Sequence, residues 1–179
     1  EKLKRDMLDW WGPKLDEYWG GTESGIVTLA SAREWLEHPG TVGKPIGPYK
    51  VYAVDESGQI LPSGVPGLLC IEHQQLQLPF HYYQAQDKTD QTFIGPGRFT
   101  IGDIGKVDEK GFVYLLDRQS SIIISGGVNI YPAEIELLLA AHPAVADVAV
   151  FAIPHDEWGE EVKAVVELQH GAQPGEDLA

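Results

Sequence analysis

The sequence predicts an α+β fold in which short strands outnumber helices. Residues 40–116 consist of short apolar runs separated by turn-forming residues, a pattern typical of antiparallel strands. Residues 2–11 and 132–141 instead carry apolar side chains at helical spacing. The pattern changes near residues 117–121, after which a strand, a helix and two more strands are predicted. We therefore expect a second structural unit to begin there.

The composition is that of an ordinary globular protein and argues against some classes of function. Of the 179 residues, 43% are apolar, which is enough for a buried core. The 27 acidic and 13 basic residues give a formal charge of -14, which argues against nucleic acid as a partner. No apolar stretch approaches the roughly 20 residues that a membrane helix needs. We expect no transmembrane segment and a cytoplasmic protein.

Cys70 is the only cysteine and lies in the apolar run 67–71. We expect a buried thiol, and no disulfide can form within the chain. The chain starts at Glu1 without a methionine and stops at Ala179 in a polar stretch. We interpret these ends as those of a fragment of a longer protein.

The first forty residues are predicted to contain two helices and two strands. One face of a helix over 2–11 would be formed by Leu3, Met7, Leu8 and Trp11, and Gly12-Pro13 would end this helix. Residues 14–19 and 25–30 are predicted strands. Ser31 and Glu34 have capping-box spacing, which predicts a short helix that ends at residues 38–40.

Two turns of the same form organise the middle of the chain. Residues 55–58 and 108–111 both read Asp-Glu-x-Gly between apolar runs. Each turn places glycine where a left-handed residue is needed before the return strand. They predict two hairpins within a twisted, mostly antiparallel sheet or partial barrel.

The last sixty residues are predicted to form a β-α-β-β unit. Residues 121–125 form the first strand, and Pro132 starts a helix over 132–141. We expect Ile135, Leu138 and Leu139 to form the buried face of this helix. Two strands follow, over residues 145–153 and 161–168.

Residues 18–25, Tyr-Trp-Gly-Gly-Thr-Glu-Ser-Gly, have the side chains that a nucleotide site needs. An aromatic ring suits a base, glycines allow close backbone approach, a hydroxyl suits phosphate and a carboxylate suits Mg²⁺. The alternative is a solvated turn after an edge strand.

Two later segments also carry candidate ligand-binding residues. Asp103, flanked by glycines in residues 100–105, suits the hydrogen-bond donors of a ribose diol. Arg118 suits phosphate oxygens, and Gly126-Gly127 would let the backbone approach a ligand. The alternatives are a turn aspartate, and a hairpin turn beside a surface arginine.

Taken in this order, the three segments resemble the motifs of the adenylate-forming superfamily, which includes acyl- and aryl-CoA synthetases, luciferases and peptide-synthetase adenylation domains. YWGGTE resembles its Tyr-Gly-x-Thr-Glu motif, and FTIGDIG resembles its Thr-Gly-Asp motif. DRQSSIIISGGVNIYPAEIE resembles the motif that opens its mobile C-terminal domain, and residues 142–168 resemble the stretch that follows. The resemblance covers nearly the whole chain. Within the superfamily, SGGVNIYPAEIE is most similar to fatty-acyl and related CoA synthetases.

The resemblance implies a division into three parts. Residues 1–39 would end an N-terminal AMP-binding α/β core. Residues 40–117 would form a β-rich, distorted-barrel subdomain. Residues 118–179 would form the N-terminal half of a small α+β C-terminal domain. The phosphate loop and the lysine that promotes adenylation would lie outside this chain.

The resemblance also implies a reaction. An acyl-CoA synthetase joins a small-molecule carboxylate to CoA at the expense of ATP, by way of an acyl-adenylate, and needs Mg²⁺. The alternatives are an adenylation domain that loads a carrier protein, and a catalytically inactive fragment that only binds nucleotide weakly.

The resemblance assigns roles residue by residue. Tyr18, Trp19, Gly20 and Gly21 would contact the nucleotide, with Trp19 in place of the tyrosine that stacks on adenine. Thr22 would bind phosphate, Glu23 would bind Mg²⁺ and Asp103 the ribose hydroxyls. Arg118 would contact ribose or phosphate, so that Thr22, Glu23 and Arg118 form the catalytic set. Gly126 and Gly127 would line the pantetheine tunnel. Ser120 stands at the expected hinge, where an aspartate or lysine is usual.

Overall fold

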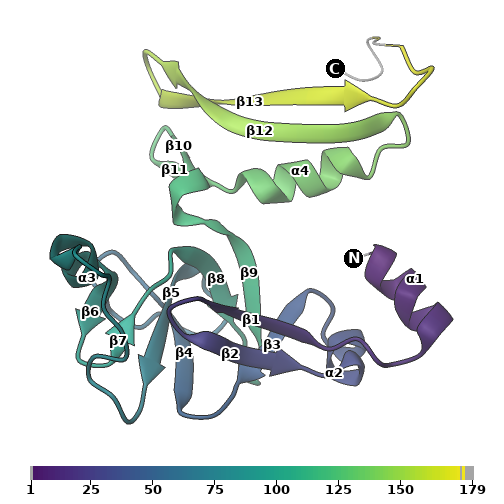
Figure 1. Cartoon of the computed structure of the whole chain (residues 1–179). Coiled ribbons are helices and arrows are strands. Elements are labelled where there is room, and N and C mark those ends of the chain that lie inside the picture. Colours follow the sequence, from purple (N-terminus) through teal and green to yellow (C-terminus); the bar gives the residue numbers. More distant parts are fainter. Residues whose placement is uncertain (1, 174, 176–179) are drawn as a thin grey trace. The chain divides into compact units, whose positions relative to one another are not determined.

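A computed structural model describes residues 2–173 and 175 of the chain (Figure 1). The chain divides into two compact units, Glu1–Leu115 and Leu116–Ala179. Helices and strands occur in both, and each unit contains one antiparallel sheet. The predicted α+β class is confirmed.

The first unit is built around a 9-stranded sheet. Its strands run in the order β1-β2-β3-β9-β8-β5-β7-β6, with β4 paired to β5 outside this path. The elements are α1 (Lys2–Trp11), β1 (Glu17–Gly21), β2 (Gly25–Ala30), α2 (Ala32–Glu37), β3 (Thr41–Pro45), β4 (Tyr49–Val54), β5 (Gly67–His73), α3 (Gln86–Thr92), β6 (Phe93–Gly95), β7 (Arg98–Phe99), β8 (Asp103–Val107) and β9 (Val113–Arg118). Because β3 pairs with β2, the division expected at residue 39 falls within one sheet.

The two predicted hairpin turns form, and each is held by its first aspartate. The Asp55 carboxylate accepts hydrogen bonds from the backbone N–H groups of Ser57 and Gln59. Asp108 accepts in the same way from the backbone of Lys110 and Phe112. The turn glycines have φ of 80° and 84°, the left-handed region that favours glycine. Local sequence chemistry therefore determines both turns.

The core of this unit consists mainly of large apolar side chains. Leu69, Ile71 and Phe99 are fully buried, and Trp19 and Val27 pack in the same cluster. Burial of each such side chain contributes about 1.5–3 kcal/mol of stability. The core thus includes Trp19, a residue of the first motif.

The helix predicted over residues 2–11 forms, but its expected apolar face is only partly buried. Leu8 packs with Ala32 and Trp35, whereas Leu3 and Trp11 are exposed. Only part of the predicted apolar face therefore packs against the rest of this unit. The contact with Trp35 buries fewer side chains of the helix than their spacing in the sequence indicates.

The capping box predicted at Ser31 is confirmed. The Ser31 hydroxyl accepts the Glu34 backbone N–H at 3.3 Å, and the Glu34 carboxylate accepts the Ser31 backbone N–H at 2.9 Å. This second hydrogen bond holds the pKa of Glu34 below its ordinary value. The reciprocal pair fixes the start of α2 directly after β2.

The second unit contains a 4-stranded sheet and one helix. Its elements after the turn Gln119–Ser121 are β10 (Ile123–Ser125), β11 (Val128–Ile130), α4 (Pro132–Ala140), β12 (Val145–His155) and β13 (Gly159–Leu168), and the strand order is β11-β10-β13-β12. Strand β11 was not predicted. The Asp117 carboxylate accepts the Ala133 backbone N–H at 3.0 Å in the first turn of α4, which satisfies an otherwise unpaired helix donor.

The apolar face predicted for the helix after Pro132 is corrected at one position. Ile135 and Leu139 are half-buried, but Leu138 is 76% exposed.

No helix in the described part of the chain is long and apolar enough to cross a membrane.

Candidate functional site

The first motif forms the end of one hairpin. Strands β1 and β2 pair antiparallel, and their register shifts between Trp19 and Gly20. A Cβ atom at Gly20 would lie 1.9 Å from the Gly25 carbonyl oxygen, so only glycine fits there. The Ser24 hydroxyl accepts the Gly21 backbone N–H at 3.3 Å, and the Tyr49 hydroxyl donates to the Ser24 carbonyl. The loop that carries Thr22 and Glu23 is therefore closely constrained.

The first and second motifs meet at a hydrogen bond between Trp19 and Asp103. The indole Nε1 donates to Asp103 Oδ2 at 2.7 Å, across 84 positions of sequence. Only 5% of Trp19 and 7% of Asp103 are exposed. Because a buried carboxylate needs hydrogen-bond donors, Trp19 fixes the orientation of the acid that was expected to bind ribose.

The aromatic residues of the first motif differ in exposure. Trp19 packs in the core, whereas Tyr18, its neighbour on the opposite face of β1, is 61% exposed. In this structure, Tyr18 is therefore the aromatic ring of the motif that presents a face to solvent. Stacking of Trp19 on adenine, carried over from the resemblance, stays a prediction.

The Glu23 carboxylate lies beside a tyrosine that the sequence analysis did not identify. The Tyr82 hydroxyl donates to Glu23 Oε1 at 2.7 Å. Burial of Tyr82, and then its hydrogen bond to Glu23, raise the pKa of this phenol. Nothing local in the sequence pairs these residues, since 59 positions separate them. The aromatic pair Tyr82-Tyr83 in the segment between β5 and α3 was the available signal.

The third motif lies in the second unit, and its double glycine is a hairpin turn. Gly126 and Gly127 connect β10 and β11, with φ of 56° and 82°. Two left-handed residues in a two-residue loop define the turn type that matches the twist of paired strands. The turn interpretation is confirmed, while the pantetheine role stays a prediction.

Arg118 and Ser120 lie just before this hairpin, and both are exposed. Arg118 ends β9, and Ser120 is the middle residue of a 3-10 turn, Gln119–Ser121. The Arg118 backbone N–H donates to the Asp117 carboxylate at 2.7 Å. The assigned contacts of Arg118 with ribose or phosphate and the hinge role of Ser120 stay predictions.

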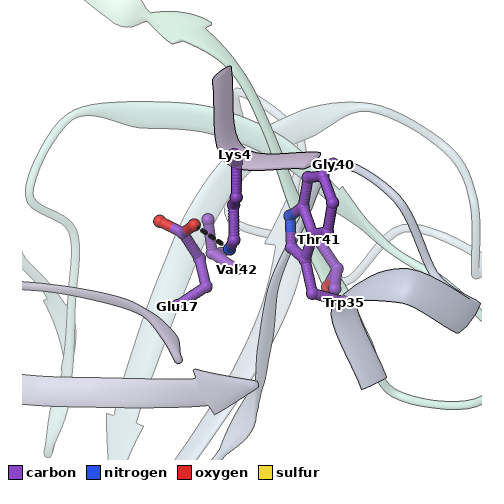
Figure 2. Close-up of a pocket in the computed structure, with 6 residues that line it drawn as sticks. All are labelled: Lys4, Glu17, Trp35, Gly40, Thr41 and Val42. Atoms are coloured by element: carbon purple, nitrogen blue, oxygen red, sulfur yellow. Dashed lines mark hydrogen bonds and ion pairs between the residues drawn. The ribbon is translucent and has the colours of Figure 1, made fainter. Parts of the chain in front are cut away.

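A cavity of about 220 Å³ lies elsewhere in the first unit (Figure 2). Figure 2 shows the Lys4 ammonium group paired with the Glu17 carboxylate at one wall. The same ammonium group lies 4.4 Å from the centroid of the Trp35 ring, a cation–π contact. No residue of the three motifs lines this cavity, so it differs from the nucleotide site expected from the sequence.

The Glu23 carboxylate is a suitable ligand for a Mg²⁺ ion that binds together with a nucleotide. Among the described residues, no group of three or more histidine, cysteine or acidic side chains is placed to hold a metal ion. Mg²⁺ that binds with a nucleotide takes only one or two carboxylates, and phosphates and water supply its other ligands. One carboxylate of fixed orientation, Glu23, is consistent with that chemistry.

Comparison with known proteins identifies the family. A family model described as AMP-binding enzyme matches residues 1–79, and one described as AMP-binding enzyme C-terminal domain matches residues 134–179. The chain belongs to the AMP-binding, or adenylate-forming, superfamily, as its motifs indicated.

Its relatives include CoA ligases. The chain is 35% identical to 4-coumarate--CoA ligase-like 9 of Oryza sativa subsp. japonica, over 93% of this chain and 30% of the relative. It is 39% identical to 2-succinylbenzoate--CoA ligase of Bacillus cereus, over 88% and 31%. The solved o-succinylbenzoate CoA synthetase of Bacillus subtilis, in complex with the acyl-adenylate intermediate OSB-AMP, superposes with a TM-score of 0.84. That alignment is 29% identical and covers 96% of this chain and 35% of the other. The chain thus spans about a third of the length of these proteins.

Proposed function

We propose that this chain is part of an ATP-dependent acyl-CoA ligase. In the first half-reaction, a carboxylate oxygen attacks the α-phosphorus of ATP, and the bond from that phosphorus to pyrophosphate breaks. In the second, the CoA thiolate attacks the acyl carbonyl carbon, and AMP leaves. Neither step requires a protein nucleophile, so the protein contributes positioning and charge stabilisation.

The observation that supports this proposal most is the Trp19–Asp103 hydrogen bond. It joins two segments that both resemble nucleotide-binding motifs of the superfamily, and it aims a buried carboxylate from β8 toward the end of β1. The second segment also passes close to the first, because a Cβ atom at Gly21 would lie 3.5 Å from Ile101 Cδ1. A ribose near Asp103 would therefore lie beside the loop that carries Thr22 and Glu23.

Each residue then has a defined task. Asp103 accepts hydrogen bonds from the ribose hydroxyls, and the Thr22 hydroxyl donates to phosphate. Glu23 would hold Mg²⁺, and the bound ion would offset the negative charge of the triphosphate. Arg118 binds ribose or phosphate with its guanidinium group. Gly126 and Gly127 supply the pantetheine passage for CoA during the second half-reaction.

The substrate class is a fatty acid or a related carboxylate. Support comes from the SGGVNIYPAEIE segment, while the two relatives described above are named for 4-coumarate and 2-succinylbenzoate. A panel should therefore contain octanoate, palmitate, 4-coumarate and 2-succinylbenzoate. We expect the full-length protein to catalyse ATP–pyrophosphate exchange with at least one of these, and to form the acyl-CoA when CoA is added. Absence of exchange with every member would contradict the proposal.

Two controls separate the alternatives. A protein that loads a carrier would transfer the acyl group to a phosphopantetheinylated carrier protein and not to free CoA. The 179-residue chain by itself is expected to show no exchange and at most weak ATP binding. Turnover by this chain alone would contradict that second expectation.

A further inference from the structure

Tyr82 lies between β5 and α3, outside all three motifs, yet it contacts the acid of the first motif. Its hydroxyl donates to Glu23 Oε1 at 2.7 Å. Both side chains are partly buried, so water competes less for this hydrogen bond than it would at an open surface.

The Tyr82 side chain is held in place from several directions. Its backbone N–H donates to the Thr89 hydroxyl at 3.0 Å, and Thr89 is 2% exposed within α3. Its ring packs edge-on against Phe80, with centroids 5.6 Å apart, and Phe80 packs in turn against the buried Phe99. The Lys88 ammonium group lies 4.0 Å from the centroid of the Tyr82 ring. The hydroxyl is therefore a fixed donor.

This donor engages one oxygen of a long side chain that could otherwise adopt several rotamers. The Glu23 side chain has several rotamers, and a hydrogen bond to Oε1 selects among them. The second oxygen, Oε2, lies on the side of Gly21, where a Cβ atom would be only 3.1 Å away. Mg²⁺ demands near-ideal octahedral geometry, so it binds best to a carboxylate whose direction is set in advance.

We infer that Tyr82 is a positioning residue, which orients the Glu23 carboxylate toward the Mg²⁺ that accompanies ATP. The inference rests on the proposed function, since it assigns Tyr82 a role in the same nucleotide site. Tyr82 acts through Glu23 and does not itself touch the substrate. The alternative is that the hydrogen bond only ties the segment between β5 and α3 to the β1–β2 hairpin.

Tyr82→Phe in the full-length protein tests the inference, because it removes the hydroxyl and keeps the ring. Loss of a group that orients a metal ligand typically weakens metal affinity about 10–100-fold. We expect the Mg²⁺ concentration for half-maximal pyrophosphate exchange to rise about tenfold. In calorimetry, ATP should bind about tenfold more weakly at subsaturating Mg²⁺, with unchanged affinity in EDTA.

Tyr83→Phe is the matched control, since Tyr83 is the adjacent tyrosine, is 84% exposed and has its hydroxyl next to Gln84. It should leave both measurements unchanged. In a Glu23→Gln background, Tyr82→Phe should produce no further shift. Thr89→Val, which removes the acceptor for the Tyr82 backbone, should shift the Mg²⁺ dependence in the same direction by less. The Thr89→Val variant also keeps the inference testable if Tyr82→Phe fails to fold.

The outcomes distinguish the inference from the proposed function. A wild-type protein with neither exchange nor ATP binding would overturn the proposed function itself. An active wild type, with unchanged Mg²⁺ dependence in Tyr82→Phe, would overturn only the inference. A lower melting temperature without a change in Mg²⁺ dependence would show a structural tie and would also overturn it.

Discussion

Trp19 has two structural roles at the scale of a single residue: it fills the core and it binds an acid. It belongs to the buried cluster that includes Val27 and Phe99, and its Nε1–H donates to the buried carboxylate of Asp103. Hydrogen bonds to charged groups contribute about 1.5–3 kcal/mol. Replacing Trp19 would therefore cost both packing and a charge-assisted hydrogen bond.

We expect Trp19→Phe to lower the free energy of unfolding by about 2–4 kcal/mol, because it removes the donor to Asp103 and leaves a void beside it. Urea unfolding followed by circular dichroism measures this difference. Trp10→Phe serves as the control, because Trp10 is 82% exposed, and its effect should stay within about 0.5 kcal/mol. Equal effects of the two substitutions would show that the buried hydrogen bond contributes nothing measurable.

Cys70 is also fully buried, and its burial protects the thiol from chemical reaction. Burial raises the pKa of this thiol to about 11. The thiolate is the reactive form, so both the low thiolate fraction and the lack of access suppress reaction at pH 8. We expect no alkylation of Cys70 by iodoacetamide in the native protein and complete alkylation in 6 M guanidinium chloride. Peptide mass mapping measures both, and rapid native labelling would contradict the predicted protection.

The burial of Cys70 could be predicted from the sequence, but the burial of Trp19 could not. Cys70 sits in a continuous apolar run, and such a run is buried in most folds, so its environment followed from local composition. The motif placed Trp19 among nucleotide contacts, but its burial depends on which face of β1 packs inward. The face of β1 that packs inward depends on strands distant in sequence, including β8, which carries Asp103.

At the scale of elements, the β10–β11 hairpin depends on a double glycine. Both glycines have positive φ, but their surroundings differ. A Cβ atom at Gly126 would lie 2.7 Å from Cε3 of Trp158, whereas one at Gly127 would have no neighbour within 4 Å. The Gly126 backbone N–H also donates to the Trp158 carbonyl at 2.9 Å. Alanine substitutions at the two positions therefore distinguish the cost of backbone strain alone from that of strain together with a steric clash.

We expect Gly127→Ala to destabilise the protein by about 1–2 kcal/mol, the usual cost of a left-handed conformation for a residue with a Cβ atom. Gly126→Ala should cost more than Gly127→Ala, because the Trp158 ring must also move. Differential scanning calorimetry of both variants measures the order. If Gly127→Ala were the more damaging, steric contact with Trp158 would not be the larger cost at Gly126.

Element prediction succeeded where the signal was local. The two Asp-Glu-x-Gly turns and the Ser31 capping box formed as expected, because the side chains that hold them lie within four positions. Strand β11 was missed because it spans only Val128–Ile130 and is defined by its pairing with β10. The Tyr82–Glu23 hydrogen bond was missed because it joins segments that only the fold brings together.

At the scale of the whole molecule, the proposed reaction has two half-reactions that act in turn on the same acyl group. The family resemblance implies that the C-terminal domain rotates between adenylation and thioester formation, and Ser120 stands at the expected pivot. Ser120 is exposed within the 3-10 turn Gln119–Ser121. A small residue in a three-residue turn places few packing constraints on a change of φ and ψ.

We expect Ser120→Pro in the full-length protein to slow thioester formation more than adenylation. Proline fixes φ near −65° and disfavours a helical conformation at the preceding residue, Gln119. The exchange of pyrophosphate into ATP should fall less than threefold, while the rate of acyl-CoA formation from preformed acyl-adenylate should fall about tenfold or more. Ser120→Ala, which leaves φ unrestricted, is the matched control and should leave both rates unchanged. Equal loss of the two half-reactions in Ser120→Pro would remove Ser120 from the hinge, because a pivot acts on the step that follows rotation.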